Sequence, residues 1–233
     1  IIPACDVELS KLRDIIKFTS SLEQVGAYKV GFYLSLKHSL RHVVEFIRCY
    51  TDKPIIYDHQ KAGTDVEHTG MIFSQVMRYS DVDGAILFPF TGKDVEVRWI
   101  KELWDAGIYV IVGGYMTHRG FFTDEGGFID RSSAMEIYKV AAEMGVKDYV
   151  VPSTRTELVF EIERVLKDMG VSPTFYLPGI GLQGGRLDKI KRLKRFHIIV
   201  GRSIYEGDVK ANIDKVVSEF DEKVRSGKEK KND

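Results

Sequence analysis

The sequence predicts a single-domain α/β protein built as a (β/α)8 barrel of the TIM-barrel class. Three observations support this prediction. The 233 residues, 44% of them hydrophobic, are enough for one compact barrel. Short apolar runs alternate with amphipathic segments from one end of the chain to the other, and eight such pairs can be counted. No break in composition divides the chain, so the barrel is favoured over the alternative, an open doubly wound sheet.

Each expected strand is a short run that is apolar on both faces, as is typical of parallel strands covered by helices. The expected strands are residues 1–5, 27–32, 54–57, 84–88, 108–112, 148–151, 174–177 and 197–200. The expected helices are residues 9–22, 36–50, 65–79, 94–106, 133–144, 156–169, 187–195 and 209–224. A long loop is expected over 113–131. We expect the barrel to span residues 1–225, followed by a charged, frayed tail over 226–233.

Composition narrows the class of partner. Lys plus Arg and Asp plus Glu both number 34, so the zero formal charge gives no general attraction to nucleic acid or to a membrane surface. No apolar run has membrane-spanning length. The two cysteines, Cys5 and Cys49, form no disulfide framework, so a cytoplasmic location is expected. No spacing of His and carboxylate residues indicates a metal site.

The third expected strand is followed by an acid, a base and a second acid: Asp58, Lys61 and Asp65. Functional side chains in these barrels lie where strands end. The first and second strands add Asp6 and Lys29, which gives a chain of charges of alternating sign that compensate one another when buried. Such an array can hold an ammonium group beside a developing carbanion. The alternative is a surface salt bridge with a helix N-cap at Asp65.

Glycine-rich turns follow the seventh and eighth expected strands. The first is Pro178-Gly179-Ile180-Gly181-Leu182-Gln183-Gly184-Gly185, and the second is Gly201-Arg202-Ser203. Glycines let backbone N–H groups approach a dianion, and these two strand ends form a common phosphate site in such barrels. Arg202 can add a bidentate charged contact. The two turns therefore predict a phosphate-binding site.

Six motifs occur in the same order as in a known enzyme family. They are Asp6, Lys29-Val30-Gly31, the charged segment 58–65, Pro152-Ser153-Thr154-Arg155, the glycine-rich segment 178–185 and Val200-Gly201-Arg202-Ser203-Ile204-Tyr205. With these motifs the chain resembles the orotidine 5′-monophosphate decarboxylases, especially the short archaeal and bacterial type. The resemblance runs from the first expected strand to the last.

The charged segment departs from the family pattern. The family has Asp-x-Lys-x-x-Asp, whereas this chain has Asp58-x-x-Lys61-x-x-x-Asp65, with one extra residue in each gap. Because alternate residues of a strand point in opposite directions, each extra residue has to be absorbed locally. We expect a bulge or a tighter turn at residues 59–60 and at residues 63–64, and Gly63 makes the second distortion easier.

The resemblance implies decarboxylation of orotidine 5′-monophosphate at pyrimidine C6 to give uridine 5′-monophosphate, the last step of de novo pyrimidine synthesis, without a metal or a cofactor. It implies that Lys61 protonates C6 and that Asp58 lies near the departing carboxylate and holds Lys61. It further implies that Asp6 and Lys29 bind the ribose hydroxyls, and that Lys29 completes the catalytic charge array together with Asp65.

The resemblance also assigns the remaining ligand contacts. Asp65 and Thr69 would cross a homodimer interface toward the neighbouring ribose site, and Thr117 would contact the pyrimidine edge. The phosphate and its closing loop would involve Gln183, Gly184, Gly201 and Arg202.

Two other functions stay open. Related decarboxylases and aldolases act on keto-sugar phosphates and use a Glu in the second strand to bind Mg²⁺. This chain has Lys29 there, which cannot serve as that ligand at neutral pH. The second alternative is a non-catalytic nucleotide-binding barrel, and the altered spacing of the charged segment is its support. A need for Mg²⁺ would favour the first alternative, and ligand binding without turnover would favour the second.

Overall fold

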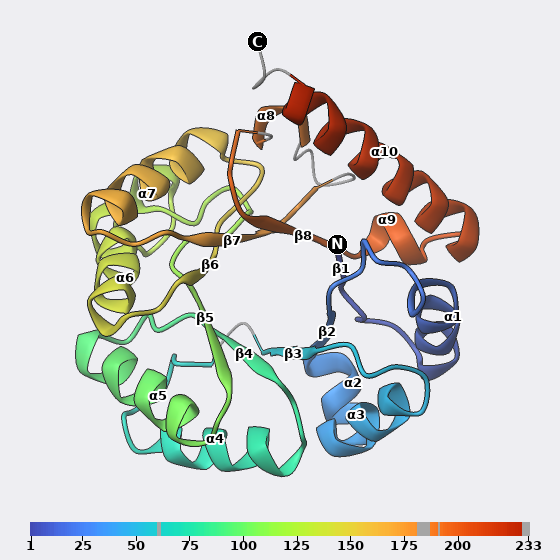
Figure 1. The fold of residues 1–233 in the computed structure, drawn as a ribbon. Helices are drawn as coiled ribbons and strands as arrows, with labels where there is room; N and C mark the ends of the chain where they lie inside the picture. Colours follow the sequence, from blue (N-terminus) through green and yellow to red (C-terminus); the bar gives the residue numbers. More distant parts are fainter. Residues whose placement is uncertain (60–61, 181–186, 191, 230–233) are drawn as a thin grey trace.

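The chain folds into a closed barrel of eight parallel strands surrounded by helices (Figure 1). The computed structural model describes residues 1–59, 62–180, 187–190 and 192–229. Neighbouring strands follow the order β1-β8-β7-β6-β5-β4-β3-β2. A bridge between Ala4 and Lys29 joins the first strand to the second and closes the ring. The predicted (β/α)8 fold is therefore confirmed.

The strands are β1 (Ile2–Pro3), β2 (Tyr28–Gly31), β3 (Ile55–Asp58), β4 (Gly84–Leu87), β5 (Tyr109–Gly113), β6 (Asp148–Val150), β7 (Thr174–Pro178) and β8 (Phe196–Val200). The helices are α1 (Leu9–Thr19), α2 (Phe32–His38), α3 (Leu40–Arg48), α4 (Thr69–Tyr79), α5 (Lys93–Asp105), α6 (Arg131–Met144), α7 (Thr156–Asp168), α8 (Leu187–Ile190), α9 (Arg202–Tyr205) and α10 (Val209–Glu229), with a 3₁₀ turn, η1 (Thr123–Glu125). None of the described helices combines the length and the apolar character needed to cross a membrane.

The strands are buried on both faces, as their apolar sequences predict. Outward-facing side chains pack against the helices in one large cluster. A smaller cluster fills the barrel interior and includes Ile56, Ile86, Ile111 and Ile199. This interior layer separates the two ends of the barrel.

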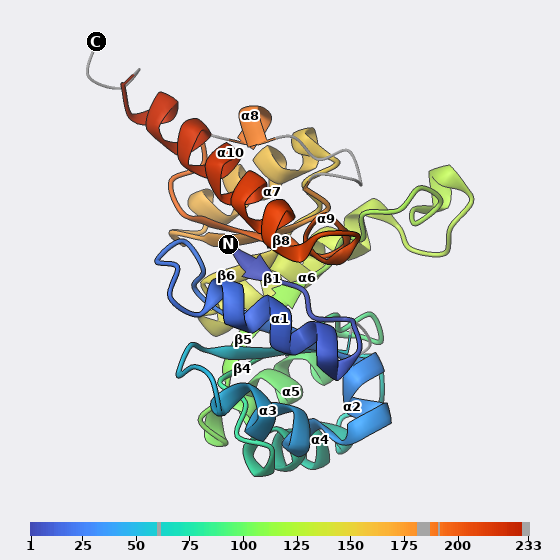
Figure 2. The same ribbon diagram turned by 90° about the vertical axis from the view of Figure 1, so that its right-hand side faces the viewer.

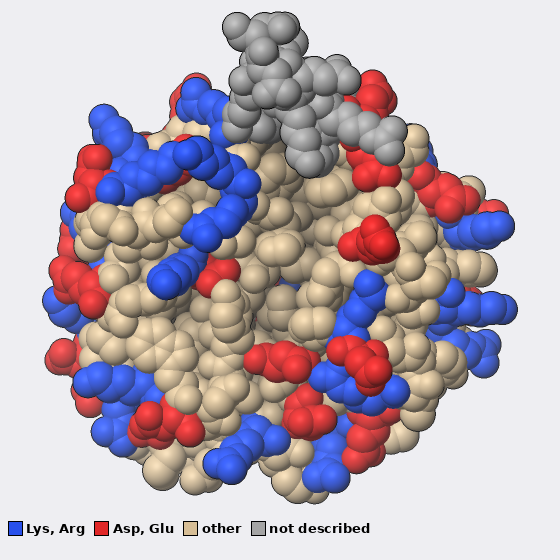
Figure 3. Space-filling view, viewed as in Figure 1, with Lys and Arg blue, Asp and Glu red and all other residues tan. Residues whose placement is uncertain are grey.

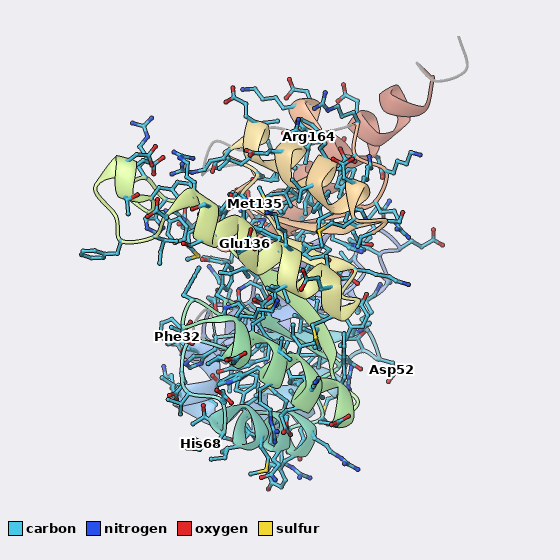
Figure 4. The ribbon with its side chains drawn as sticks, turned by 90° about the vertical axis from the view of Figure 1, so that its left-hand side faces the viewer. Phe32, Asp52, His68, Met135, Glu136 and Arg164 are labelled. Carbon is cyan, nitrogen blue, oxygen red and sulfur yellow. The ribbon has the colours of Figure 1, made fainter. Side chains whose placement is uncertain are left out.

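The two ends can be told apart in Figure 4. Asp52, which precedes β3, lies on one side, whereas Phe32 and His68, which follow β2 and β3, lie on the opposite side. Figure 1 therefore views the barrel from the end where the strands begin. The loop between β5 and α6, residues 114–130, projects from the end where the strands finish (Figure 2).

Several boundaries differ from the expected ones. The single helix expected over 36–50 is two helices, because Ser39 has a positive φ of 62° and its Oγ accepts a hydrogen bond from the backbone N–H of His42 at 3.4 Å. The helix expected over 187–195 is only the single turn α8, and residues 192–195 are not helical. Helix α10 continues to Glu229, so residues 226–229, which we expected to fray, are helical. The short α9 was not anticipated.

Candidate active site

A cavity of about 190 Å³ lies at the end of the barrel where the strands finish. It is lined by the charged residues Asp6, Lys29 and Asp58 and by Gly201 and Arg202. Strand register explains the first group: Gly31 pairs with Asp58, and Lys29 is bridged to Ala4, so β1, β2 and β3 present these side chains together. The cavity thus has a charged wall from β1, β2 and β3 and a glycine–arginine wall where the neighbouring β8 ends.

Lys29 lies between two carboxylates. Its Nζ is 2.8 Å from Asp58 Oδ2 and 3.6 Å from Asp6 Oδ2. Lys29 and Asp58 are each only 6% exposed. Burial alone would lower the pKa of Lys29, but the charges of Asp58 and Asp6 outweigh it and raise the pKa above its ordinary value. Lys29 is therefore a fixed ammonium at neutral pH, and the two carboxylates around it leave this group of three with a net negative charge.

Gly31 allows Asp6 to approach the second strand. A Cβ atom at Gly31 would lie 2.1 Å from Asp6 Oδ1 and 3.2 Å from Asp6 Cγ. Any side chain would therefore displace the carboxylate. Sequence reasoning placed Gly31 in a motif without finding this role, because the contact joins residues from two different strands.

The middle of the charged segment is not placed. Lys61 lies outside the described residues, and so does the first of the two expected distortions. At the second, Gly63 adopts a left-handed φ of 85°, which glycine reaches without a steric cost. The neighbouring backbone is tied to the end of β4, since Phe88 N–H donates to the Ala62 carbonyl at 2.8 Å and Thr64 Oγ1 donates to the Phe88 carbonyl at 2.6 Å.

Asp65 and Thr69 do not line the cavity of their own chain. Asp65 is exposed, and its carboxylate accepts from the backbone N–H of Val66 at 2.8 Å. Thr69 Oγ1 donates to the Val66 carbonyl at 2.7 Å. Helix α4 begins at Thr69 with His68 as its N-cap, so the expected helix start and N-cap at Asp65 are corrected. The structure thus separates these two residues from Asp6, Lys29 and Asp58.

The glycine–arginine wall contains the two residues predicted to bind phosphate that the structure describes. Gly201 and Arg202 both line the cavity, where β8 passes into α9. Gly179 lines it too and has a left-handed φ of 94°. Gln183 and Gly184 lie outside the described residues. An exposed guanidinium beside glycine backbone N–H groups is suited to an anionic group.

Thr117 lines the cavity at the start of the projecting loop. A clamp that sequence reasoning missed holds this loop: Arg155 Nη2 donates to Glu125 Oε2 at 2.7 Å and to the His118 carbonyl at 2.8 Å. The hydrogen bonds from Arg155 lower the pKa of Glu125 to about 2. Arg155 belongs to a motif that the sequence displayed, but its partner lies 30 residues away, so no local pattern could have paired them.

Three aromatic residues also line the cavity: Phe88, Tyr115 and Tyr205. Sequence reasoning gave none of them a role, although Tyr205 ends one of the quoted motifs. Each follows a strand, and that position was the available signal. Within the described residues, no group of three or more His, Cys, Asp or Glu side chains is placed to hold a metal ion.

Comparison with known proteins gives one consistent result. No protein-family model matches the sequence. The chain is 30% identical over 203 residues to an orotidine 5′-phosphate decarboxylase of Methanosarcina mazei, covering 87% of this chain and 86% of the relative. It is 31% identical over 193 residues to that of Pyrococcus furiosus, covering 80% and 81%. The crystal structure of orotidine 5′-monophosphate decarboxylase from Methanocaldococcus jannaschii complexed with the inhibitor BMP matches with a TM-score of 0.79 at 25% identity, over 93% of this chain and 95% of that one.

Proposed function

The chain belongs to the orotidine 5′-phosphate decarboxylase family, and we propose that Lys61 is the proton donor of its reaction. The enzyme removes CO2 from orotidine 5′-monophosphate and produces uridine 5′-monophosphate, in pyrimidine biosynthesis. The observation that carries the assignment of the site is the charged group Asp6–Lys29–Asp58, which lines one cavity together with Gly201 and Arg202.

The two walls fix the direction in which we place the substrate. The phosphate lies against Gly201 and Arg202, where a guanidinium and glycine backbone are available. The ribose hydroxyls lie toward Asp6 and Lys29, and the pyrimidine edge lies toward Thr117, with Gln183 and Gly184 closing over the phosphate. The remote phosphate then supplies binding energy that holds the reacting carbon beside the charged wall.

The charged wall supports an assignment of roles. Loss of CO2 breaks the bond between C6 and the carboxylate carbon and leaves the electron pair on C6, which then takes a proton. Lys29 is a poor donor, because Asp58 and Asp6 hold its proton and raise its pKa. The proton therefore comes from a second ammonium, Lys61, which follows Asp58 by three residues in the sequence. Asp58, fixed by Lys29, holds Lys61 near C6 and leaves it beside the developing carbanion.

A homodimer completes the proposed site. Asp65 and Thr69 lie away from their own cavity, on a surface rich in exposed apolar side chains. These include Phe32, Leu36, Val66, Met71, Ile72 and Val76. Apolar surface of this kind is typical of protein interfaces. We therefore place Asp65 and Thr69 at the ribose site of a second copy. We also propose a cytoplasmic location, where the free thiols of Cys5 and Cys49 would stay reduced.

An ultraviolet assay of orotidylate consumption in the presence of EDTA tests this function. We expect full turnover with the chelator, since the proposed roles use only side chains of the chain itself. Activity that requires added Mg²⁺ would instead support a keto-sugar-phosphate type of chemistry. Uridylate binding with no change in orotidylate absorbance would support a non-catalytic nucleotide-binding barrel.

A further inference from the structure

A second hollow opens at the other end of the barrel, where the strands begin. Its volume is about 320 Å³, and it is lined in part by Ile2, Ala27, Ile56, Tyr109, Tyr176 and His197. We call it the strand-start hollow. Figure 3 shows it at the centre of this face, with an uncharged floor and charged side chains around the rim. Among the described residues, none lines both this hollow and the active cavity, so the two are separate.

The hollow exists because small residues occupy inward positions at the start of two strands. Barrel interiors of this class are usually filled by branched side chains. Here Ala27 precedes β2 and Gly84 begins β4, and both line the hollow. At Gly84 a Cβ atom would lie only 3.2 Å from the Tyr109 carbonyl oxygen, so a side chain there is disfavoured and none enters the hollow from this position. An apolar cavity of about 150 Å³ already holds benzene in another protein, so the space is sufficient for a substituted ring.

The walls differ in chemistry from one side to the other. Ile2, Ala27 and Ile56 make one side aliphatic. Tyr176 and His197 make the other side aromatic, and their ring centroids are 5.0 Å apart with an angle of 37° between the ring planes. Aromatic rings favour offset or tilted contacts with further rings. A flat molecule placed between the two sides would contact carbon on one face and ring electrons on the other.

The polar groups of this region favour an uncharged ligand over an anion. The Tyr109 hydroxyl donates a hydrogen bond to Asp148, which is itself buried. Asp83 is engaged by Arg48 and by the Ile55 backbone N–H, each at 2.7 Å. Of the two carboxylates only Asp83 lines the hollow, and a phosphorylated or carboxylated ligand would meet it there, which disfavours such a molecule.

His197 is the group left for a ligand. Within the part of the chain that the structure describes, its ring makes no hydrogen bond, although it lines the hollow. Burial lowers the pKa of His197, so the imidazole is neutral at pH 7. A neutral imidazole offers one donor and one acceptor nitrogen, which fits a hydroxyl group or a ring N–H.

We propose that the strand-start hollow is a second binding site, for a small uncharged aromatic or heteroaromatic molecule that stacks against Tyr176 and His197 and hydrogen-bonds to His197. The site is independent of the decarboxylation chemistry, because a packed layer that includes Ile86 and Ile111 lies between them.

Phenol is a direct probe of this site, and toluene, which has a similar ring but no hydroxyl, is the matched comparison. We expect saturable NMR shifts of the backbone amides of Ala27 and His197, with a dissociation constant on the order of 1 mM for phenol. Ala27→Leu fills the hollow and should abolish both signals, whereas Ala211→Leu, the same change at an exposed position of α10, should leave them unchanged. Orotidylate turnover by each variant reports that the barrel is folded.

A second variant separates hydrogen bonding from space filling. His197→Phe keeps an aromatic ring but removes both ring nitrogens, so phenol should bind about tenfold more weakly and toluene unchanged. Absence of saturable shifts in the unmodified protein would overturn the proposal. Binding that survives Ala27→Leu in an active enzyme would also overturn it, as would equal losses of phenol and toluene binding in His197→Phe.

Discussion

Gly31→Ala is the sharpest test of the charged wall. The added methyl carbon would lie 2.1 Å from Asp6 Oδ1, whereas ordinary contacts begin at 3.4 Å, so the carboxylate has to move by more than about 1 Å. The φ of Gly31 is −107°, which alanine adopts without strain, so the steric clash is the main perturbation. A misplacement of about 1 Å costs on the order of a hundredfold in rate, or about 2.7 kcal/mol. We expect kcat/KM for orotidylate to fall by about that factor.

The assay is the loss of orotidylate absorbance, with thermal unfolding to show that each variant is folded. Gly26→Ala is the matched control, because a Cβ atom there meets nothing within 4 Å and should leave activity unchanged. If Gly31→Ala acts through Asp6, adding it to Asp6→Ala should cost little more, since the displaced group is already gone. Near-normal activity of a folded Gly31→Ala protein, or full additivity with Asp6→Ala, would refute the reasoning.

Four further outcomes are expected. Lys61→Ala should abolish turnover while uridylate still binds in a calorimetric titration. Turnover by this variant would show that Lys61 is not the proton donor. Arg202→Ala should weaken uridylate binding by at least about tenfold but hardly affect uridine; equal losses would place the phosphate elsewhere. Leu36→Asp, at a side chain 77% exposed, should shift sedimentation toward the monomer, and an unchanged dimer would exclude this surface. Burial raises the pKa of Glu96 from 4.5 to about 9, so the unfolded chain loses this proton first and stability falls as pH rises through this range. In denaturant titrations, the free energy of unfolding of Glu96→Gln should therefore rise relative to that of the unmodified protein by up to about 1.4 kcal/mol per pH unit between about pH 5 and pH 8. A difference in unfolding free energy that stays constant with pH would contradict the burial argument.

The barrel could be predicted from the sequence because its strands are apolar on both faces and its helices are amphipathic. Those two patterns recur eight times, which is the number of units in this barrel. The break at Ser39 could not be predicted in the same way. Serine occurs inside helices as well as at N-caps, so the residue type alone does not mark Ser39 as the N-cap of a new helix.

The sequence predicted the parts of the site that lie on or directly after strands. Asp6 follows β1, Lys29 lies within β2 and Asp58 ends β3, and closure of the barrel brings these three neighbouring strands together, so the proximity of the three side chains follows from the fold. The arrangement around Glu125 and Arg155 depends instead on the path of a long loop. Charged residues in loops have many possible partners, and only the folded chain selects one.

The position of Lys29 has a consequence for how activity depends on pH. Its ammonium is buried, yet two carboxylates at 2.8 and 3.6 Å keep its pKa above the ordinary value. The raised pKa means that Lys29 stays charged at neutral and moderately alkaline pH, and its stabilising contribution is lost only when the pH rises above that range. A loss of activity in mildly alkaline solution must therefore report a group other than Lys29. Because Lys29 keeps its charge, Asp58 keeps its partner, and the geometry of this wall of the cavity stays constant at neutral and moderately alkaline pH.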